Sequence, residues 1–107
     1  MLRNTVISLM KEGKPLFRYP VKATFKDGTG ETVISVPKRH FKRAVKRNLL
    51  KRRMREAYRL NRGILADSTP DIFFYYVGTE VESYEKISES IRSLLSNMVA
   101  GQADTTV

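Results

Sequence analysis

The sequence predicts an α+β domain of two layers, with helices packed on a small mixed β-sheet. The chain of 107 residues is long enough for one domain and too short for two. Some segments alternate apolar and polar residues, as strands do, and others repeat apolar residues every three or four positions, as helices do. The expected order is helix, strand, strand, helix, strand, helix, within a single domain over residues 1–100.

The first quarter of the chain is expected to hold a short helix and a strand. Val6 and Met10 stand one helical turn apart within residues 5–12, which predicts an amphipathic helix that ends at the following glycine. Residues 15–20 are interpreted as an irregular connection. Along residues 19–26 apolar and polar side chains alternate, so this segment is predicted to be a strand with one buried face.

Two further strands are predicted, and their pairing is only partly specified. Residues 27–30, Asp-Gly-Thr-Gly, are typical of a turn, and the β-branched segment 32–36 follows, so we expect a hairpin between 19–26 and 32–36. After a loop at 66–71, residues 72–77 are apolar enough for a strand in the middle of the sheet. The sequence leaves open a parallel pairing of 32–36 with 72–77, through the helix between them.

The C-terminal segment predicts a long amphipathic helix. Ser83 is suited to cap its N-terminus, and Glu85 in the first turn would interact favourably with the helix dipole. Apolar residues at helical spacing would form its buried stripe: Ile87, Ile91, Leu94, Leu95 and Met98. Residues 101–107 are expected to be a frayed tail.

The charge of the chain is concentrated in one segment. The formal net charge is +9, yet residues 38–62 contain twelve basic residues against one acidic residue, Glu56. The rest of the chain is therefore faintly acidic. Such a local concentration of positive charge favours a polyphosphate partner such as a nucleic acid.

Within this segment the cations are expected to share one face of a helix. Four of them follow one another at intervals of four residues and would form a ridge: Arg47, Lys51, Arg55 and Arg59. Three apolar residues fall on another face and would pack on the sheet: Leu50, Met54 and Ala57. Like charges one turn apart repel by a few tenths of a kcal/mol per pair, which the phosphates of a nucleic acid would offset.

A basic helix can also be a solvated surface or an anchor on anionic lipid. The density of the charge weakens the first alternative, and the second would require Trp or Phe where the apolar face holds Ala57 and medium-sized residues. No segment approaches the roughly 20 apolar residues of a membrane span, and the chain has no cysteine. We therefore expect a cytoplasmic protein with no membrane partner.

The residues offer little for independent catalysis. His40 is the one histidine, and no carboxylate stands near it in the sequence, so an RNA-facing or surface role is favoured over a general base. The acidic stretch 80–89 is best interpreted as solvated surface, and Asp67 and Asp71 as turn or capping residues. We expect no catalytic residue and no metal site within the chain.

The basic segment resembles that of a known family. It contains the pattern Arg-Asn-x-x-Lys-Arg-x-x-Arg-Glu, which begins at Arg47 and ends at Glu56, and Ser-Val-Pro-Lys-Arg precedes it at residues 35–39. This combination resembles the signature of the bacterial ribonuclease P protein component. The order of the predicted elements agrees with that family over residues 5–98.

The resemblance implies the protein subunit of an RNA-based endonuclease. In this family a catalytic RNA removes the 5′ leader of precursor tRNA with magnesium held mainly by the RNA, and the protein assists by binding the RNA subunit and the leader. A left-handed crossover through the basic helix is also implied, against the usual right-handed rule, and no obligate protein partner is expected. The implied RNA contacts are Lys38, Arg39, Arg43, Arg47, Asn48, Lys51, Arg52, Arg55 and Arg59.

The same resemblance implies a cleft between the first helix and the sheet that holds the single-stranded leader. The family often places aromatic side chains on the first helix, where bases can stack. Val6 and Met10 stand at the matching positions here. Phe17, Tyr19 and Phe25 are nearby aromatic candidates, with a place in the core as the alternative for each.

Two other functions are compatible with the residues. One is a stand-alone RNA-binding module of the ribosomal or double-stranded-RNA-binding type, which shares the layout of sheet and helices. The other is a small nuclease that acts by itself. Cleavage of precursor tRNA, tested with and without the RNA subunit, would separate the three.

Overall fold

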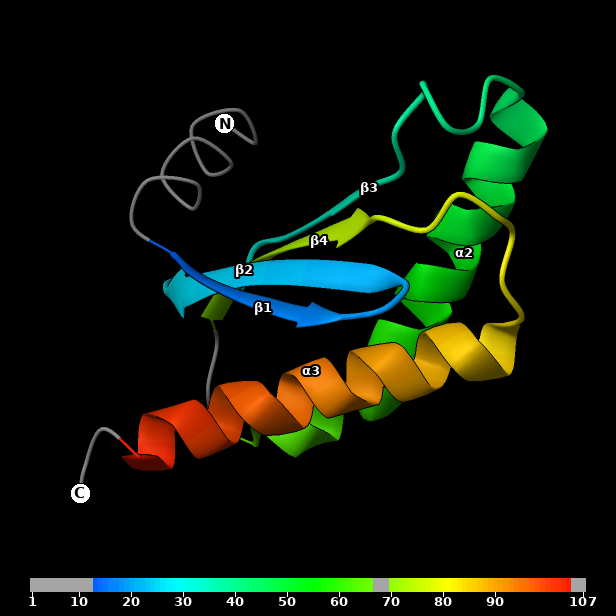
Figure 1. Ribbon diagram of the computed structural model, residues 1–107. Helices are drawn as coiled ribbons and strands as arrows, with labels where there is room; N and C mark the ends of the chain where they lie inside the picture. Colours follow the sequence, from blue (N-terminus) through cyan, green and yellow to red (C-terminus); the bar gives the residue numbers. More distant parts are fainter. Residues whose placement is uncertain (1–12, 67–69, 105–107) are drawn as a thin grey trace.

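The computed structural model describes residues 13–66 and 70–104, which form a four-stranded sheet with helices packed on one face (Figure 1). In chain order the elements are β1 (Lys14–Arg18), β2 (Val21–Asp27), β3 (Thr32–Ser35), α2 (Ala44–Asn61), the 3-10 helix η1 (Arg62–Leu65), β4 (Pro70–Tyr76) and α3 (Tyr84–Asp104). The α+β class predicted from the sequence is confirmed. The helix predicted at residues 5–12 lies outside the described residues.

The order of the strands across the sheet is β1-β2-β4-β3. β2 pairs antiparallel with both β1 and β4, whereas β3 pairs parallel with β4. The parallel arrangement that the sequence left open is therefore present, with α2 in the crossover between β3 and β4. The predicted hairpin between residues 19–26 and 32–36 is wrong, because β4 lies between those two strands.

The carboxylate of Asp71, at the start of β4, explains why β2 and β3 are apart. Its Oδ1 accepts hydrogen bonds from the backbone N–H groups of Thr29 (3.1 Å), Gly30 (3.1 Å) and Glu31 (2.9 Å). A Cβ at Gly28 would lie 2.1 Å from the Asp71 Oδ2, so a larger residue there would displace the carboxylate. Asp71 is a capping residue, as predicted, but the turn that it caps lies 40 residues earlier in the chain.

Residues 14–18 form strand β1, where the sequence had suggested an irregular connection. Each residue of β1 pairs with one of β2, from Lys14 opposite Phe25 to Arg18 opposite Val21. β1 is an edge strand, and an edge tolerates Pro15 because no further strand needs its missing N–H. The Tyr19–Pro20 peptide bond that follows β1 is cis.

The core lies between one face of the sheet and one stripe of each helix. β2 and β4 bury alternate residues, so their other side chains point to the opposite face of the sheet. The strands contribute Val21, Ala23, Phe25, Ile72, Phe74 and Tyr76. The helices contribute Leu50, Met54, Ala57, Ile87, Ile91, Leu94, Leu95 and Met98, which confirms both predicted apolar stripes.

Helix α3 begins as the sequence predicts. The Ser83 Oγ accepts a hydrogen bond from the Lys86 N–H at 3.2 Å, which is an N-cap. At its other end α3 continues to Asp104, beyond Gly101, where the predicted tail begins. Pro70 and Asp71 belong to β4 and not to the predicted loop at 66–71. None of the described helices is long and apolar enough to cross a membrane.

Candidate nucleic-acid interface

The N-terminus of α2 presents positive charge without compensation from its own first turn. Arg43 is the N-cap residue, and its side chain makes no capping hydrogen bond. Its carbonyl accepts hydrogen bonds from the N–H groups of Lys46 (3.2 Å) and Arg47 (3.3 Å). The first turn contains no acidic residue. An anion such as a phosphate would be stabilised at this end of the helix dipole.

The turn before α2 is anchored by one aromatic residue. Phe41 is 4% exposed, and its ring packs edge-on against Tyr76 with 5.7 Å between the ring centroids. The basic side chains around it are exposed: Lys38, Arg39, Lys42 and Arg43. The turn therefore presents its cations from a fixed backbone.

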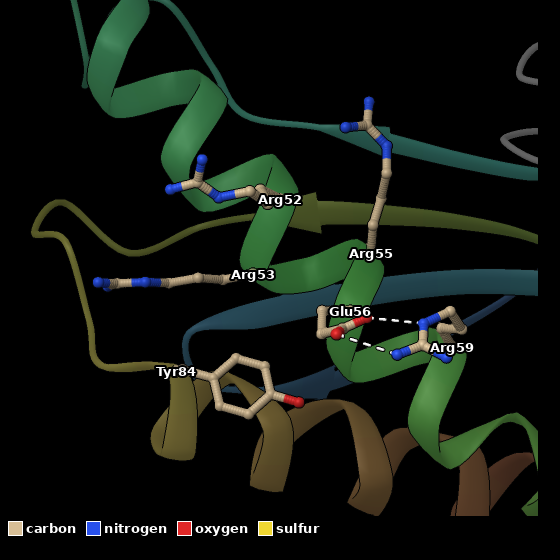
Figure 2. Close-up of a pocket in the computed structure, with 6 residues that line it drawn as sticks. All are labelled: Arg52, Arg53, Arg55, Glu56, Arg59 and Tyr84. Carbon is tan, nitrogen blue, oxygen red and sulfur yellow. Dashed lines mark hydrogen bonds and ion pairs between the residues drawn. The ribbon is translucent and has the colours of Figure 1, made fainter.

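The ridge predicted on α2 lies beside the buried stripe of the helix, and its C-terminal half, Arg55 and Arg59, is exposed. Leu50, Met54 and Ala57 are fully buried, so the opposite side of the helix meets solvent. In Figure 2 the side chains of Arg52 and Arg55 extend outward from α2. Of the nine predicted RNA contacts, only Arg47 and Lys51 are half-buried, and seven are exposed: Lys38, Arg39, Arg43, Asn48, Arg52, Arg55 and Arg59.

Arg47 has a structural role that the sequence did not reveal. Its Nη1 donates hydrogen bonds to the backbone carbonyls of Phe41 (2.7 Å) and Lys42 (2.9 Å). The guanidinium group thereby ties the basic turn to the first turns of α2. Because a guanidinium has five N–H donors, the remaining ones can still contact an RNA.

The one acidic residue of the basic segment pairs with a single arginine. Glu56 accepts from Arg59 through both oxygens, at 2.7 Å from Nε and 3.0 Å from Nη2. This hydrogen bond lowers the pKa of Glu56 and raises the pKa of Arg59. Among the described residues, no acidic side chain pairs with Arg52 or Arg55. Their positive charges are available to an external anion.

Arg53 connects α2 to the segment between β4 and α3. Its Nη1 donates to the Glu82 carbonyl at 2.5 Å. The Tyr76 hydroxyl donates to the Glu80 carbonyl at 2.5 Å and accepts from the Glu82 N–H at 3.2 Å. Burial raises the pKa of Tyr76 to about 12. These contacts fix the position of the α3 N-terminus relative to α2.

Comparison with known proteins places the basic helix in its family. Residues 7–99 match the family model described as Ribonuclease P. The chain belongs to the ribonuclease P protein family. Two relatives described as Ribonuclease P protein component, from two strains of Porphyromonas gingivalis, are 33% and 32% identical over 106 residues, which cover 88% of this chain and 77% of each relative. The family suggested by the Arg47 to Glu56 pattern is thus confirmed.

Solved structures of ribonuclease P proteins share the fold. The protein from Thermotoga maritima, in complex with 1-(4-fluorophenyl)-2-thiourea, matches with a TM-score of 0.78 and 26% identity over 89% of this chain and 94% of that one. A second Thermotoga maritima structure matches with a TM-score of 0.77 and 27% identity over 91% and 94% of the two chains. The Staphylococcus aureus protein, at 19% identity and a TM-score of 0.75 over 89% of each chain, shows the likeness of fold alone.

The residues predicted to contact the leader lie in different parts of the structure. Val6 and Met10 lie outside the described residues. Phe25 is 7% exposed and belongs to the core, which removes it as a candidate. Tyr19 is exposed, but its hydroxyl donates to Glu82 at 3.3 Å on the side of α3. Phe17, 63% exposed on β1, keeps an accessible ring.

The sequence did not single out two aromatic residues on the other face of the sheet. Phe73 and Tyr75 of β4 line a shallow hollow of about 290 Å³ with Lys22 and Thr24 of β2. The centroids of the Phe73 and Tyr75 rings lie 6.1 Å apart. Phe17 lies opposite Lys22 in the pairing of β1 with β2, so its side chain points to the same face. The available signal was the run of four aromatic residues at 73–76, because alternate residues of a strand face opposite sides of the sheet. The sequence prediction treated this strand as buried on both faces and so did not separate the two sides.

Proposed function

We propose that this protein assists a catalytic RNA in removing the 5′ leader from precursor tRNA. In this proposal α2 and the turn before it bind the RNA subunit, and the face of the sheet that carries Phe73 and Tyr75 binds the leader. The chain contributes binding and positioning, while the chemistry of phosphodiester hydrolysis belongs to the RNA.

The unpaired guanidinium groups of α2 are the observation that supports RNA binding most directly. Arg52 and Arg55 are exposed, and no described acidic side chain neutralises them. Each phosphate that they contact would release condensed counterions, and a guanidinium can hold two phosphate oxygens at once. The phosphates of the RNA backbone would then offset the repulsion between the neighbouring cations of α2.

The leader site is supported by the combination of aromatic and basic side chains on the second face of the sheet. Single-stranded RNA is held by rings on which bases stack and by cations beside its backbone. Phe17, Phe73 and Tyr75 supply the rings, and Lys22 supplies a cation. The two binding surfaces lie on different parts of the fold, so the protein could hold both RNAs at once.

Magnesium would be held by the RNA and not by this chain. Within residues 13–66 and 70–104 no group of three or more His, Asp or Glu side chains is arranged to hold a metal ion. The protein's contribution would be to lower the repulsion between the leader and the RNA subunit, so that less magnesium is needed for the two to associate.

Reconstitution tests the proposal. The rate of leader release from precursor tRNA is measured with the RNA subunit, with and without the protein, over a series of magnesium concentrations. We expect the protein to raise the rate most at low magnesium. Absence of stimulation would contradict the proposal, and cleavage by the protein without the RNA subunit would identify a nuclease in its own right.

Two double variants that remove the same amount of charge test which surface is responsible for the stimulation. Arg52→Gln with Arg55→Gln removes two cations from α2, and Lys14→Gln with Arg92→Gln removes two exposed cations from β1 and α3. We expect the first pair to lose most of the stimulation at low magnesium and the second to keep it. Equal losses would show that total charge, and not the α2 surface, is responsible.

A further inference from the structure

A hollow lies between α2 and the first turn of α3, beside the arginine ridge (Figure 2). Its volume is about 470 Å³, within the range of sites that hold small ligands. Six residues line it: Arg52, Arg53, Arg55, Glu56, Arg59 and Tyr84. The lining thus combines four arginines with one glutamate and one tyrosine.

The walls of the hollow are held by contacts already present in the protein. The Ser83 cap makes Tyr84 the first residue of α3, with 3.2 Å between the Ser83 Oγ and the Lys86 N–H. The bond from Arg53 to the Glu82 carbonyl ties α2 to the residues just before Tyr84. The two hydrogen bonds to Glu56 hold the Arg59 guanidinium in place, and Figure 2 shows the Tyr84 ring below and to the left of that pair.

The residues that line the hollow indicate the charge and the shape of the ligand that it would bind. Arg52 and Arg55 have no acidic partner among the described residues, so the ligand should be an anion. Tyr84 is half-buried, and its hydroxyl makes no hydrogen bond to any residue that the structure describes. A tyrosine ring and guanidinium planes both stack on flat aromatic groups. Tyr84 packs partly against the core and also lines the hollow. A bare phosphate would leave its remaining surface without a contact, and an apolar ligand would leave the cations without a partner, whereas a nucleotide would contact both.

We propose that this hollow receives one unstacked nucleotide of a bound RNA, with its base against Tyr84 and its phosphate at Arg52 and Arg55. The inference rests on the RNA-binding function proposed above. It adds a base contact from α3 to a surface that otherwise contacts only the RNA backbone.

A photoreactive side chain at position 84 tests the contact directly. Tyr84→p-benzoylphenylalanine is irradiated with the RNA subunit alone, with precursor tRNA alone and with both. We expect a cross-link to one or two adjacent unpaired nucleotides, and the RNA that contains them identifies the source of the nucleotide.

Asn48→p-benzoylphenylalanine, on the exposed side of α2, is the control. Cross-links from position 48 without any from position 84 would overturn the pocket while leaving RNA binding by α2 intact. Cross-links from position 84 spread over paired regions would also overturn it. Absence of cross-links from both positions would contradict RNA binding by α2 and also the nucleotide pocket.

The RNA affinity of two variants at position 84 distinguishes a stacking contact from a charge contact. Tyr84→Leu should weaken binding of the RNA found in the cross-linking experiment about tenfold, and Tyr84→Phe should stay within about twofold of the original protein, because the ring is retained. The slope of log Kd against log salt concentration should not change in either variant, since no phosphate contact is lost. Wild-type affinity in a folded Tyr84→Leu variant, or an equal loss in Tyr84→Phe, would overturn the stacking contact.

Discussion

The two long helices of this protein are built in opposite ways. α3 has a serine cap and Glu85 in its first turn. Of its side chains at residues 84–99, whose burial the structure describes, six are buried: Ile87, Ser90, Ile91, Leu94, Leu95 and Met98. α2 has neither a side-chain cap nor an acidic residue in its first turn, and it buries only three side chains: Leu50, Met54 and Ala57. α3 thus follows the rules that stabilise a helix, whereas α2 breaks several of them along its exposed surface.

The arginines of α2 compensate in part for what the helix lacks. Arg47 holds the preceding turn, and Arg53 holds the segment before α3. Both contacts join α2 to neighbouring segments of the chain, whereas α3 is stabilised by its own cap. The comparison separates the arginines that stabilise the fold from those, such as Arg52 and Arg55, whose charge is left for a partner.

The largest effect on stability should come from the core stripe of α3. Leu94→Ala removes a fully buried side chain and leaves a cavity, so the free energy of unfolding should fall by about 2–5 kcal/mol. Urea denaturation followed by circular dichroism measures it. At temperatures where the variant is folded, its RNA affinity should be unchanged. A loss below about 1 kcal/mol would mean that α3 carries less of the core than its burial indicates.

A smaller effect, on binding alone, is expected from the exposed arginines of α2. Arg52→Gln with Arg55→Gln should weaken affinity for the RNA subunit roughly 10- to 100-fold and make the slope of log Kd against log salt shallower by about 1.5. Unfolding free energy should stay within about 0.5 kcal/mol of the original. Filter binding at several salt concentrations provides the measurement, with Lys14→Gln and Arg92→Gln as the matched pair. A large loss of unfolding free energy would contradict the assignment of Arg52 and Arg55 to binding and not to the stability of α2.

The smallest effects should come from exchanging the caps. Ser83→Ala should cost α3 about 1 kcal/mol of unfolding free energy, because the Lys86 N–H loses its acceptor. Arg43→Ser should instead stabilise α2 by about 0.5–1 kcal/mol, since Arg43 already has the extended backbone of a cap residue. We expect Arg43→Ser to bind RNA more weakly despite its higher melting temperature. A gain in both properties would show that the missing cap has no connection with binding.

Helices α2 and α3 and the exposed basic residues of α2 were predictable from the sequence, because their signals are local. The stripe from Ile87 to Met98 and the cations at intervals of four residues each identify one face of one helix. The edge strand β1 was missed since only Leu16 among its five residues is even half-buried, which leaves no alternation to detect.

The errors in the sheet and the site have a common physical cause, which is contact between distant parts of the chain. The Asp-Gly-Thr-Gly segment is typical of a hairpin, but Asp71 binds its backbone from 40 residues away and brings β4 between the two strands. Likewise, the pairing of Arg53 with the Glu82 carbonyl and the position of Tyr84 beside α2 depend on tertiary packing. Phe25 lies in the core, which is the alternative that the sequence analysis gave for it.

The order of the strands also bears on how the chain assembles during synthesis. β1 and β2 are neighbours in sequence and in the sheet, so they can pair as soon as both have left the ribosome. β3 has β4 as its neighbour in the sheet, and β4 follows α2 in the chain. The arginine-rich helix is therefore synthesised before the strand and the helix that hold it in place. For that interval it is a basic segment without a fixed position, and its first electrostatic contacts would form before its fold is complete.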